Sequence, residues 1–461
     1  MSAIITDPFK KQLLQNVFNE VDNLTNRYYV GIGKNDQWNV DETVPTPIDA
    51  PKKIIDAKNQ LQSVKAVAAA SYVIPRRNWA SGAIYDAYDD LYTTIPSNSY
   101  YVLTEDNQVY ICLQQSKKAD GTANVSTVKP TGTATKRFTT ADGYTWKFLY
   151  ALSASDTSAF LSANFIPVKK VSALDSDAFS IQQKAVQDSA VAGRILNIVV
   201  TEAGSNYTQG TTSVTITGNT PTAGDSAFAT ATVTNGSITK IEMLNESAGS
   251  GKNFDNATIT ITDTGSGTGA KARAVLGPRN GIGADPRDDL KSTSLMFNSK
   301  PNGNETGTFL TTAAAHGGTN TDFRQVILLR DPESAGGTLI ATSKKALQFL
   351  KTSSTSSFSV DDLITNSKTI PARAFVDQVD SNRVYFHQND SSGFTQFEVG
   401  DTITNGSVTA TLINAGSGVG DSAVSSEGYK NLSGEVLYIE NRAPVIRDDN
   451  QTEDIKVVIT L

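Results

Sequence analysis

The stretch SYVIPRRNWASGAIYDAYDD, residues 71–90, holds the residue types best suited to chemistry or recognition. Arg76, Arg77 and Trp79 are followed by tyrosines and aspartates, with no further lysine or arginine. Nucleic-acid binding needs a basic surface with aromatic rings for stacking, and the aspartates here would repel phosphate. Catalysis by a nucleophile needs a base beside it, and the stretch has no such pair. The pattern therefore favours a structural loop.

A structural loop leaves two roles open for these residues. Pro75 fixes its own backbone and biases Ile74 toward an extended conformation. Arg76 and Arg77 can then bond to carboxylates or backbone carbonyls, while burial anchors Trp79. Arginine, tryptophan and tyrosine are also enriched where proteins meet. The loop either pins the fold within the chain or contacts another subunit.

Candidates for metal or nucleophilic chemistry are few. Neither His316 nor His387 has a second histidine or cysteine at metal-ligand spacing, so we interpret both as structural or exposed. The single cysteine, Cys112, lies between apolar residues and is predicted to be a small buried hydrophobe. The glycine-rich GSGTGA, residues 265–270, precedes a strand pattern and not the helix that a dinucleotide loop requires. We expect no catalytic residue, metal or cofactor.

The composition indicates several packed domains. The chain has 461 residues, 38% of them hydrophobic, and a net charge of −7. Its lysines occur in pairs and not in long runs, so no nucleic-acid surface is indicated. No signal peptide is apparent, and no stretch approaches the ~18 apolar residues of a membrane span. We expect a soluble protein, made in a cytoplasm, that does not insert into a membrane.

The elements that position these residues are predicted to be mainly strands. A helix is expected to open at Asp7-Pro8 and run to residue 22, a second to cover 51–66, and a short third to be capped by Ser155 or Asp156. Strands are predicted at 28–33, 100–104, 109–115, 143–152, 322–332, 434–446 and 453–461.

An internal repeat begins near Ile195, where glycine, serine and threonine become frequent. The matched positions are Ile195 with Ile238, Ile198 with Ile241, Tyr207 with Phe254, Val214 and Ile216 with Ile259 and Ile261, and Ala227, Ala229 and Ala231 with Ala270, Ala272 and Ala274. Each repeat contains three short strands, which predicts a pair of small β-modules over 195–277. They are either rigid surface decoration or a binding module. A second insertion-like β segment covers 352–425.

Several stretches, taken in order, resemble a known family. They are YVIPRRNW (72–79), YVLTEDNQVYICL (101–113), DGYTWKFLYAL (142–152), DFRQVILLRDP (322–332) and LSGEVLYIENRAPVI running into NQTEDIKVVIT (432–460). The family is the baseplate wedge subunit of T-even-type contractile-tailed bacteriophages, the gene-product-eight type. The 195–277 and 352–425 segments look like insertions relative to it, and Ala443-Pro444 stands where the family pattern has two prolines.

The resemblance implies a β-sandwich core with a few flanking helices. Its N-terminal part would be 1–190, its continuation 285–351 and its closing strands 430–461. The resemblance also implies a structural protein and not an enzyme: a homodimer in the virion tail baseplate that contacts other wedge proteins and relays the change of shape that triggers sheath contraction. Candidate structural or interface residues are Arg76, Arg77, Trp79, Trp146, Tyr438, Glu440 and Arg442. Glu440 is either the partner of Arg442, or one of the two reaches another chain.

Two other functions stay open. A receptor- or glycan-binding tail protein would act through the 195–277 repeats, whose aromatic residues are little more than Tyr207, Phe228 and Phe254. A tail-associated hydrolase is the third interpretation, and the scarcity of histidine and the lack of a convincing motif weigh against it.

Overall fold

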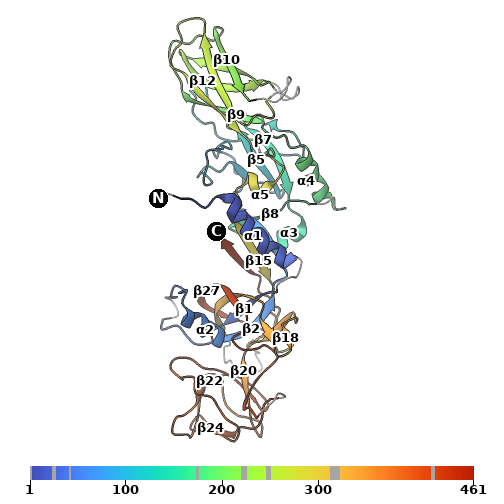
Figure 1. Ribbon diagram of the computed structural model, residues 1–461, viewed down its shortest axis with the longest axis vertical. Helices are drawn as coiled ribbons and strands as arrows, with labels where there is room; N and C mark the ends of the chain where they lie inside the picture. Colours follow the sequence, from blue (N-terminus) through green and yellow to red (C-terminus); the bar gives the residue numbers. More distant parts are fainter. Residues whose placement is uncertain are drawn as a thin grey trace. The chain divides into compact units, whose positions relative to one another are not determined.

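The computed structural model describes residues 3–22, 27–40, 43–172, 176–219, 226–244, 251–311, 322–416 and 421–461. The protein is mainly β, with 39% strand, 11% helix, and six antiparallel sheets and five helices in these ranges (Figure 1). The predicted fold class is therefore confirmed. No helix in the described ranges is long and apolar enough to cross a membrane.

The chain divides into two compact units. Unit 1 comprises Met1–Lys11, Ser71–Ser294 and Leu461–Leu461, and unit 2 comprises Gln12–Ala70 and Leu295–Thr460. The helices are α1 (Asp7–Asp22), α2 (Pro51–Asn59), α3 (Ala154–Phe160), α4 (Ala178–Asp188) and α5 (Pro286–Asp289).

The second helix is shorter than the sequence predicts. α2 ends at Asn59, and residues 61–66 form strand β2 (Leu61–Ala66), so the helix predicted over 51–66 is wrong beyond residue 59. β2 pairs antiparallel with β1 (Tyr28–Gly33), and Leu61 and Val64 are buried in the core beside Tyr29. Pairing and burial in the sheet outweigh a local pattern that suits either element.

The third helix begins at a different cap. Ser153 accepts a hydrogen bond from the Asp156 amide, and the Asp156 side chain accepts one from the Ser153 amide. This reciprocal capping box places the cap two residues before the predicted Ser155. α4 was not predicted; Asp177 caps it by accepting from the amides of Phe179 and Ser180.

Unit 1 contains the predicted hairpin and its neighbours. Strands β4 (Tyr101–Leu103), β5 (Gln108–Gln114), β7 (Thr145–Ala151) and β6 (Phe138–Thr139) form a sheet in the order β4-β5-β7-β6. Cys112 is completely buried in the apolar cluster on this sheet, so the prediction of a small buried hydrophobe is confirmed. β3 (Ala69–Pro75) pairs with β8 (Phe165–Val168).

The two repeats share one sheet instead of forming two separate modules. Their strands are β9 (Ile195–Glu202), β10 (Thr212–Gly218), β11 (Phe228–Thr234), β12 (Ser237–Leu244), β13 (Ala257–Asp263) and β14 (Lys271–Leu276). The order β12-β11-β10-β13-β14-β9 is unchanged when each strand is replaced by its repeat partner and the list is reversed. The sheet, green to yellow in Figure 1, therefore has a pseudo-twofold axis between β10 and β13. We call residues 195–276 the repeat module.

The strand register follows the same axis. The equivalent cross-strand pairs are Val214↔Ile261 with Ile216↔Ile259, and Ala231↔Ile241 with Ala274↔Ile198. The backbone bond from the Tyr207 amide to the Gly236 carbonyl has its counterpart between Phe254 and Gly193, at 2.9 and 3.0 Å. Each half is an incomplete three-stranded layer, and pairing the halves buries a single apolar core.

Unit 2 has two larger sheets. The first has the order β19-β2-β1-β16-β27, with β16 at Asp322–Arg330 and β27 at Glu435–Ile446. The second has the order β25-β24-β21-β22-β23-β20-β26 and its own apolar core. Its strands are β20 (Gln348–Lys351), β21 (Leu363–Asn366), β22 (Arg373–Asp380), β23 (Arg383–His387), β24 (Thr402–Thr404), β25 (Thr409–Thr411) and β26 (Val424–Ser426). We call residues 348–426 the second module.

Short strands complete unit 2. They are β15 (Ser294–Ser299), β17 (Glu333–Ser334), β18 (Gly337–Thr338), β19 (Ser343–Lys345) and β28 (Ile455–Thr460). The strands predicted at 28–33, 322–332, 434–446 and 453–461 are confirmed as β1, β16, β27 and β28.

Candidate functional site

The opening loop of the sequence is pinned within unit 1. Arg76 Nη1 donates to the backbone carbonyl of Ser162, and its Nε donates to Asn78 Oδ1, both at 2.9 Å. The half-buried Trp79 donates from Nε1 to Ser126 Oγ at 3.2 Å. Arg77 is exposed. Arg76 and Trp79 therefore act within the chain, and an intersubunit role for the loop stays a prediction.

Trp146 lies in the same apolar cluster against which Trp79 packs. It is completely buried, stacks on Tyr144 with 5.8 Å between ring centroids, and meets Tyr85 edge to face. Four aromatic rings in one cluster stabilise this end of the β4-β5-β7-β6 sheet. These contacts make Trp146 a core residue.

Three predicted site residues lie on β27, in unit 2. The Tyr438 hydroxyl donates to Glu440 Oε2 at 3.1 Å, and burial raises the pKa of Tyr438 to about 12. The Arg442 backbone carbonyl accepts from Trp38 Nε1 at 3.0 Å. Among the described contacts Glu440 bonds to Tyr438 and not to Arg442, so the suggested Glu440–Arg442 pair is not formed. β27 is an edge strand of its sheet, and an interface role for these three residues stays a prediction.

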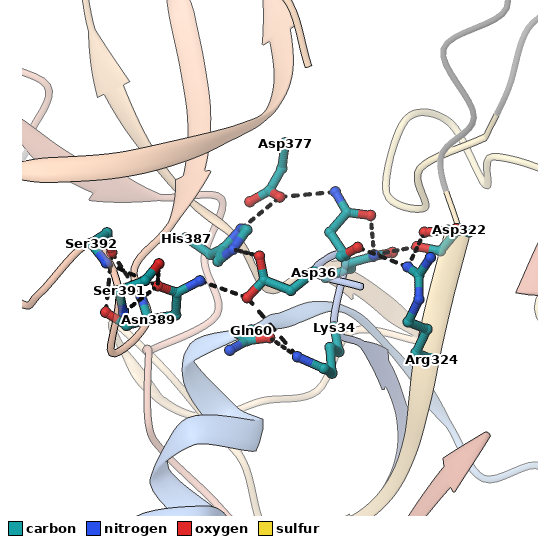
Figure 2. Close-up of polar contacts among 12 residues, drawn as sticks. Lys34, Asp36, Gln60, Asp322, Arg324, Asp377, His387, Asn389, Ser391 and Ser392 are labelled. Carbon is teal, nitrogen blue, oxygen red and sulfur yellow. Dashed lines mark hydrogen bonds and ion pairs between the residues drawn. The ribbon is translucent and has the colours of Figure 1, made fainter. Parts of the chain in front are cut away.

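The most unusual polar site is a buried histidine held between two carboxylates (Figure 2). His387, at the end of β23, contacts Asp377 Oδ1 through Nδ1 and Asp36 Oδ1 through Nε2, both at 2.8 Å. Asp377 lies on β22, the strand paired with β23, whereas Asp36 follows β1. The site therefore joins the second module to the segment after β1.

The imidazole of this site is positively charged. Burial opposes its protonation, but Asp377 and Asp36 outweigh burial and raise the pKa of His387 to about 10. Burial also disfavours the charged form of Asp36, yet the hydrogen bonds and charge of His387 lower the pKa of Asp36 to about 2. At neutral pH both ring nitrogens of the imidazolium donate to carboxylates, which leaves no lone pair to accept a proton or bind a metal.

Neighbouring side chains complete the cluster. Asn389 Nδ2 donates to Asp36 Oδ2 at 2.7 Å, and Asn389 Oδ1 accepts from the backbone amides of Ser391 and Ser392. Lys34 Nζ lies 4.0 Å from the same oxygen, Asp36 Oδ2, and Figure 2 draws this ion pair as a dashed line. Asp36 thus holds His387 and the following turn at once. We call Asp36, Asp377, His387 and Asn389 the buried clamp.

A second set of hydrogen bonds supports Asp377. Asn35 Nδ2 donates to Asp377 Oδ1 at 2.8 Å, and Gln62 Nε2 donates to Asn35 Oδ1 at 2.9 Å. The buried Arg324 donates to the Asn35 carbonyl at 2.8 Å. Through Asn35, which follows β1, the clamp is linked to β2 and β16 of the first sheet of unit 2, which suits a rigid joint.

The described residues contain no group of three or more histidine, cysteine, aspartate or glutamate side chains placed to hold a metal ion. His387 lies in a strand as its sequence predicts. His316 lies outside the described residues.

A cleft of about 440 Å³ opens beside the clamp in unit 2. Its walls are formed by Lys34, Asp36, Trp38, Asn39, Pro45, Thr46, Pro47, Ile48, Lys53, Asp56, Ala57, Gln60, Gln325, Asn389, Asp390, Ser391, Ile439 and Asn441. Such a volume is within the range of sites for small organic ligands. Sequence reasoning missed it, because its lining comes from five separate parts of the chain.

Comparison with known proteins adds no identification. Neither a protein-family model nor a curated protein matches the chain.

Proposed function

We propose that this protein is a structural subunit of the tail baseplate wedge of a contractile-tailed bacteriophage. In this role it links neighbouring wedge proteins, as a homodimer, and relays the change of baseplate shape that triggers sheath contraction. It acts in the virion and works by contacts and movement, without a chemical reaction.

One observation carries the proposal: four of the five stretches that resemble the wedge family contain strands that pair with a strand of another such stretch. DFRQVILLRDP contains β16 and GEVLYIENRAPVI contains β27, and these two strands pair from Asp322↔Ile446 to Arg330↔Glu435. The 101–113 and 142–152 stretches form β4, β5 and β7 of one sheet. The two segments without resemblance instead make sheets of their own. Insertions into an older core would have this arrangement.

The repeat module gives less support to glycan binding than its aromatic residues suggested. Tyr207 and Phe254 are 6% and 4% exposed and belong to the apolar core, so neither ring can stack on a sugar. Phe228, 61% exposed, is the remaining ring of the three named for this role. A single ring on an otherwise small-residue surface is weak support for a receptor site.

Light scattering tests the proposal directly. We expect the purified chain to have the mass of a dimer, and to enter a larger complex of defined mass when mixed with the other baseplate proteins of the same virus. A monomer, or a trimer that ignores those proteins, would overturn it.

A further inference from the structure

We propose that the cleft beside the buried clamp is a carbohydrate-binding site that takes a neutral sugar of one or two rings. This inference concerns a ligand site and does not depend on the wedge function.

The cleft has one apolar wall, which suits the C–H face of a pyranose ring. Trp38, Pro45, Pro47 and Ile48 supply it from the segment after β1. Trp38 is held in place because its Nε1 donates to the Arg442 carbonyl at 3.0 Å and the Lys34 ammonium lies 4.6 Å from the ring centroid. A wall fixed before binding lowers the entropic cost of recognition.

The lining also carries amide side chains, which suit the hydroxyl groups of the same ring. Gln60 Oε1 accepts from Lys34 at 3.3 Å, and Gln325 Nε2 donates to Asn441 Oδ1 at 2.8 Å. These bonds orient both amides. In the part of the chain that the structure describes, Gln60 Nε2 and Gln325 Oε1 have no hydrogen-bond partner, so one donor and one acceptor remain for a ligand.

The charge of the lining favours a neutral ligand. Lys34 and Lys53 are outnumbered by Asp36, Asp56 and Asp390, so the lining has no net positive charge that would attract a phosphate. A purely apolar ligand would leave the two half-buried amides desolvated and unpaired, which is costly. A ligand with an apolar face and a hydroxyl edge can pack on the apolar residues and form hydrogen bonds with the amide side chains.

Saturation-transfer NMR with the full chain tests this proposal. The probes are glucose, galactose, mannose, N-acetylglucosamine, lactose and maltose, offered separately. We expect transfer to at least one of them. Gln60→Met and Gln325→Met keep the side-chain length but remove the free donor or acceptor, and each should weaken binding about tenfold. Gln396→Met, at an exposed glutamine outside the cleft lining, is the matched control and should bind as the native chain does.

Two results would overturn the proposal. One is the absence of transfer to all six sugars. The other is transfer that survives unchanged in the Gln60→Met/Gln325→Met double variant, which would place any sugar elsewhere. Trp38→Phe keeps an aromatic ring in the lining but removes the Nε1 hydrogen bond. If this variant binds less sugar, its melting temperature shows whether the variant lost affinity or lost its fold. Binding of a peptide library with no sugar response would favour a protein ligand and would also reject the sugar assignment.

Discussion

The repeat module and the second module each form a sheet with its own apolar core, but they are attached to their surroundings by different kinds of contact. Arg273 of the repeat module pairs with Asp89 and Asp90 of unit 1, and these side chains are partly exposed, with Arg273 at 28%. The second module is attached through His387, whose side chain is 4% exposed, to Asp36, which follows β1 and is 21% exposed. An exposed ion pair contributes little to stability, whereas removing the partner of a buried charge costs several times more.

The difference shows how a chain can acquire modules of two kinds. A duplicated half-sheet buries its core against its own copy, so it needs little from its neighbours. The second module instead shares a buried charged cluster with the first sheet of unit 2, so its position is fixed together with its fold. We infer that the second module keeps a fixed position relative to the first sheet of unit 2.

The largest expected effect follows from removing the charge at the centre of the clamp. His387→Ala leaves Asp36 and Asp377 facing each other without a cation, and should lower the free energy of unfolding by about 3–5 kcal/mol. Chemical denaturation measures it. Lys430→Ala, which removes an exposed ion pair to Glu333 in the same unit, is the control. A loss below about 1 kcal/mol would mean that the clamp is no stronger than a surface pair.

The clamp should also give a pH dependence of defined sign. The pKa of His387 is raised from 6.5 to about 10, so its contribution is complete below pH 6.5 and is lost as pH rises through 10. The pKa of Asp36 is lowered from 3.8 to about 2, so its contribution is complete above pH 3.8 and is lost as pH falls through 2. The stability difference between the native chain and His387→Ala should peak between pH 3.8 and 6.5. A difference that grows from pH 6.5 to 9 would contradict this sign.

Two glycines of the repeat module should respond unequally to the same change. Gly204 and Gly251 both have positive φ, at 65° and 79°. A Cβ at Gly204 would lie 2.6 Å from the Ala270 amide nitrogen, whereas at Gly251 the nearest atom is 3.4 Å away. We expect Gly204→Ala to cost about 3 kcal/mol and Gly251→Ala about 1 kcal/mol, by thermal unfolding. Equal losses would show that backbone conformation alone sets the cost.

The smallest effect is expected at the exposed joint of the repeat module. Arg273→Ala removes its ion pairs to Asp89 and Asp90 and should cost about 1 kcal/mol or less. Denaturation under the conditions used for His387→Ala gives the comparison. If the two losses were alike, the contrast between a weak and a strong attachment would fail.

Periodic local patterns were the part of the fold that the sequence could predict. The alternating residues of the repeats identify strands, because one face of each strand packs on the core, and the apolar run of β16 identifies a strand that is buried on both faces. The pairing of the repeats could not be read in this way: Val214 and Ile216 are compatible with pairing to their own repeat or to the other. Residues 61–66 were predicted as helix because the three-residue spacing of Leu61 and Val64 fits one face of a helix. The same spacing also fits a strand that is buried on both faces.

The buried clamp had almost no sequence signal. His387 and Asp36 are 351 positions apart, and neither lies in a recognisable motif. His387 and Asp377 lie on paired strands, which only the register of β22 with β23 reveals. The role of the Arg76 loop was easier to predict, because Pro75 and Trp79 indicate a fixed, anchored backbone. The contacts to Ser162 and Ser126, however, depend on the tertiary fold.

The most direct test of the proposed function is electron cryo-microscopy of tails from the virus that encodes this chain. We predict that the chain fits density in each wedge of the baseplate, with the second module fixed to unit 2 in both extended and contracted tails. Density for the chain only in fibres outside the baseplate, or no density in the tail, would contradict the assignment.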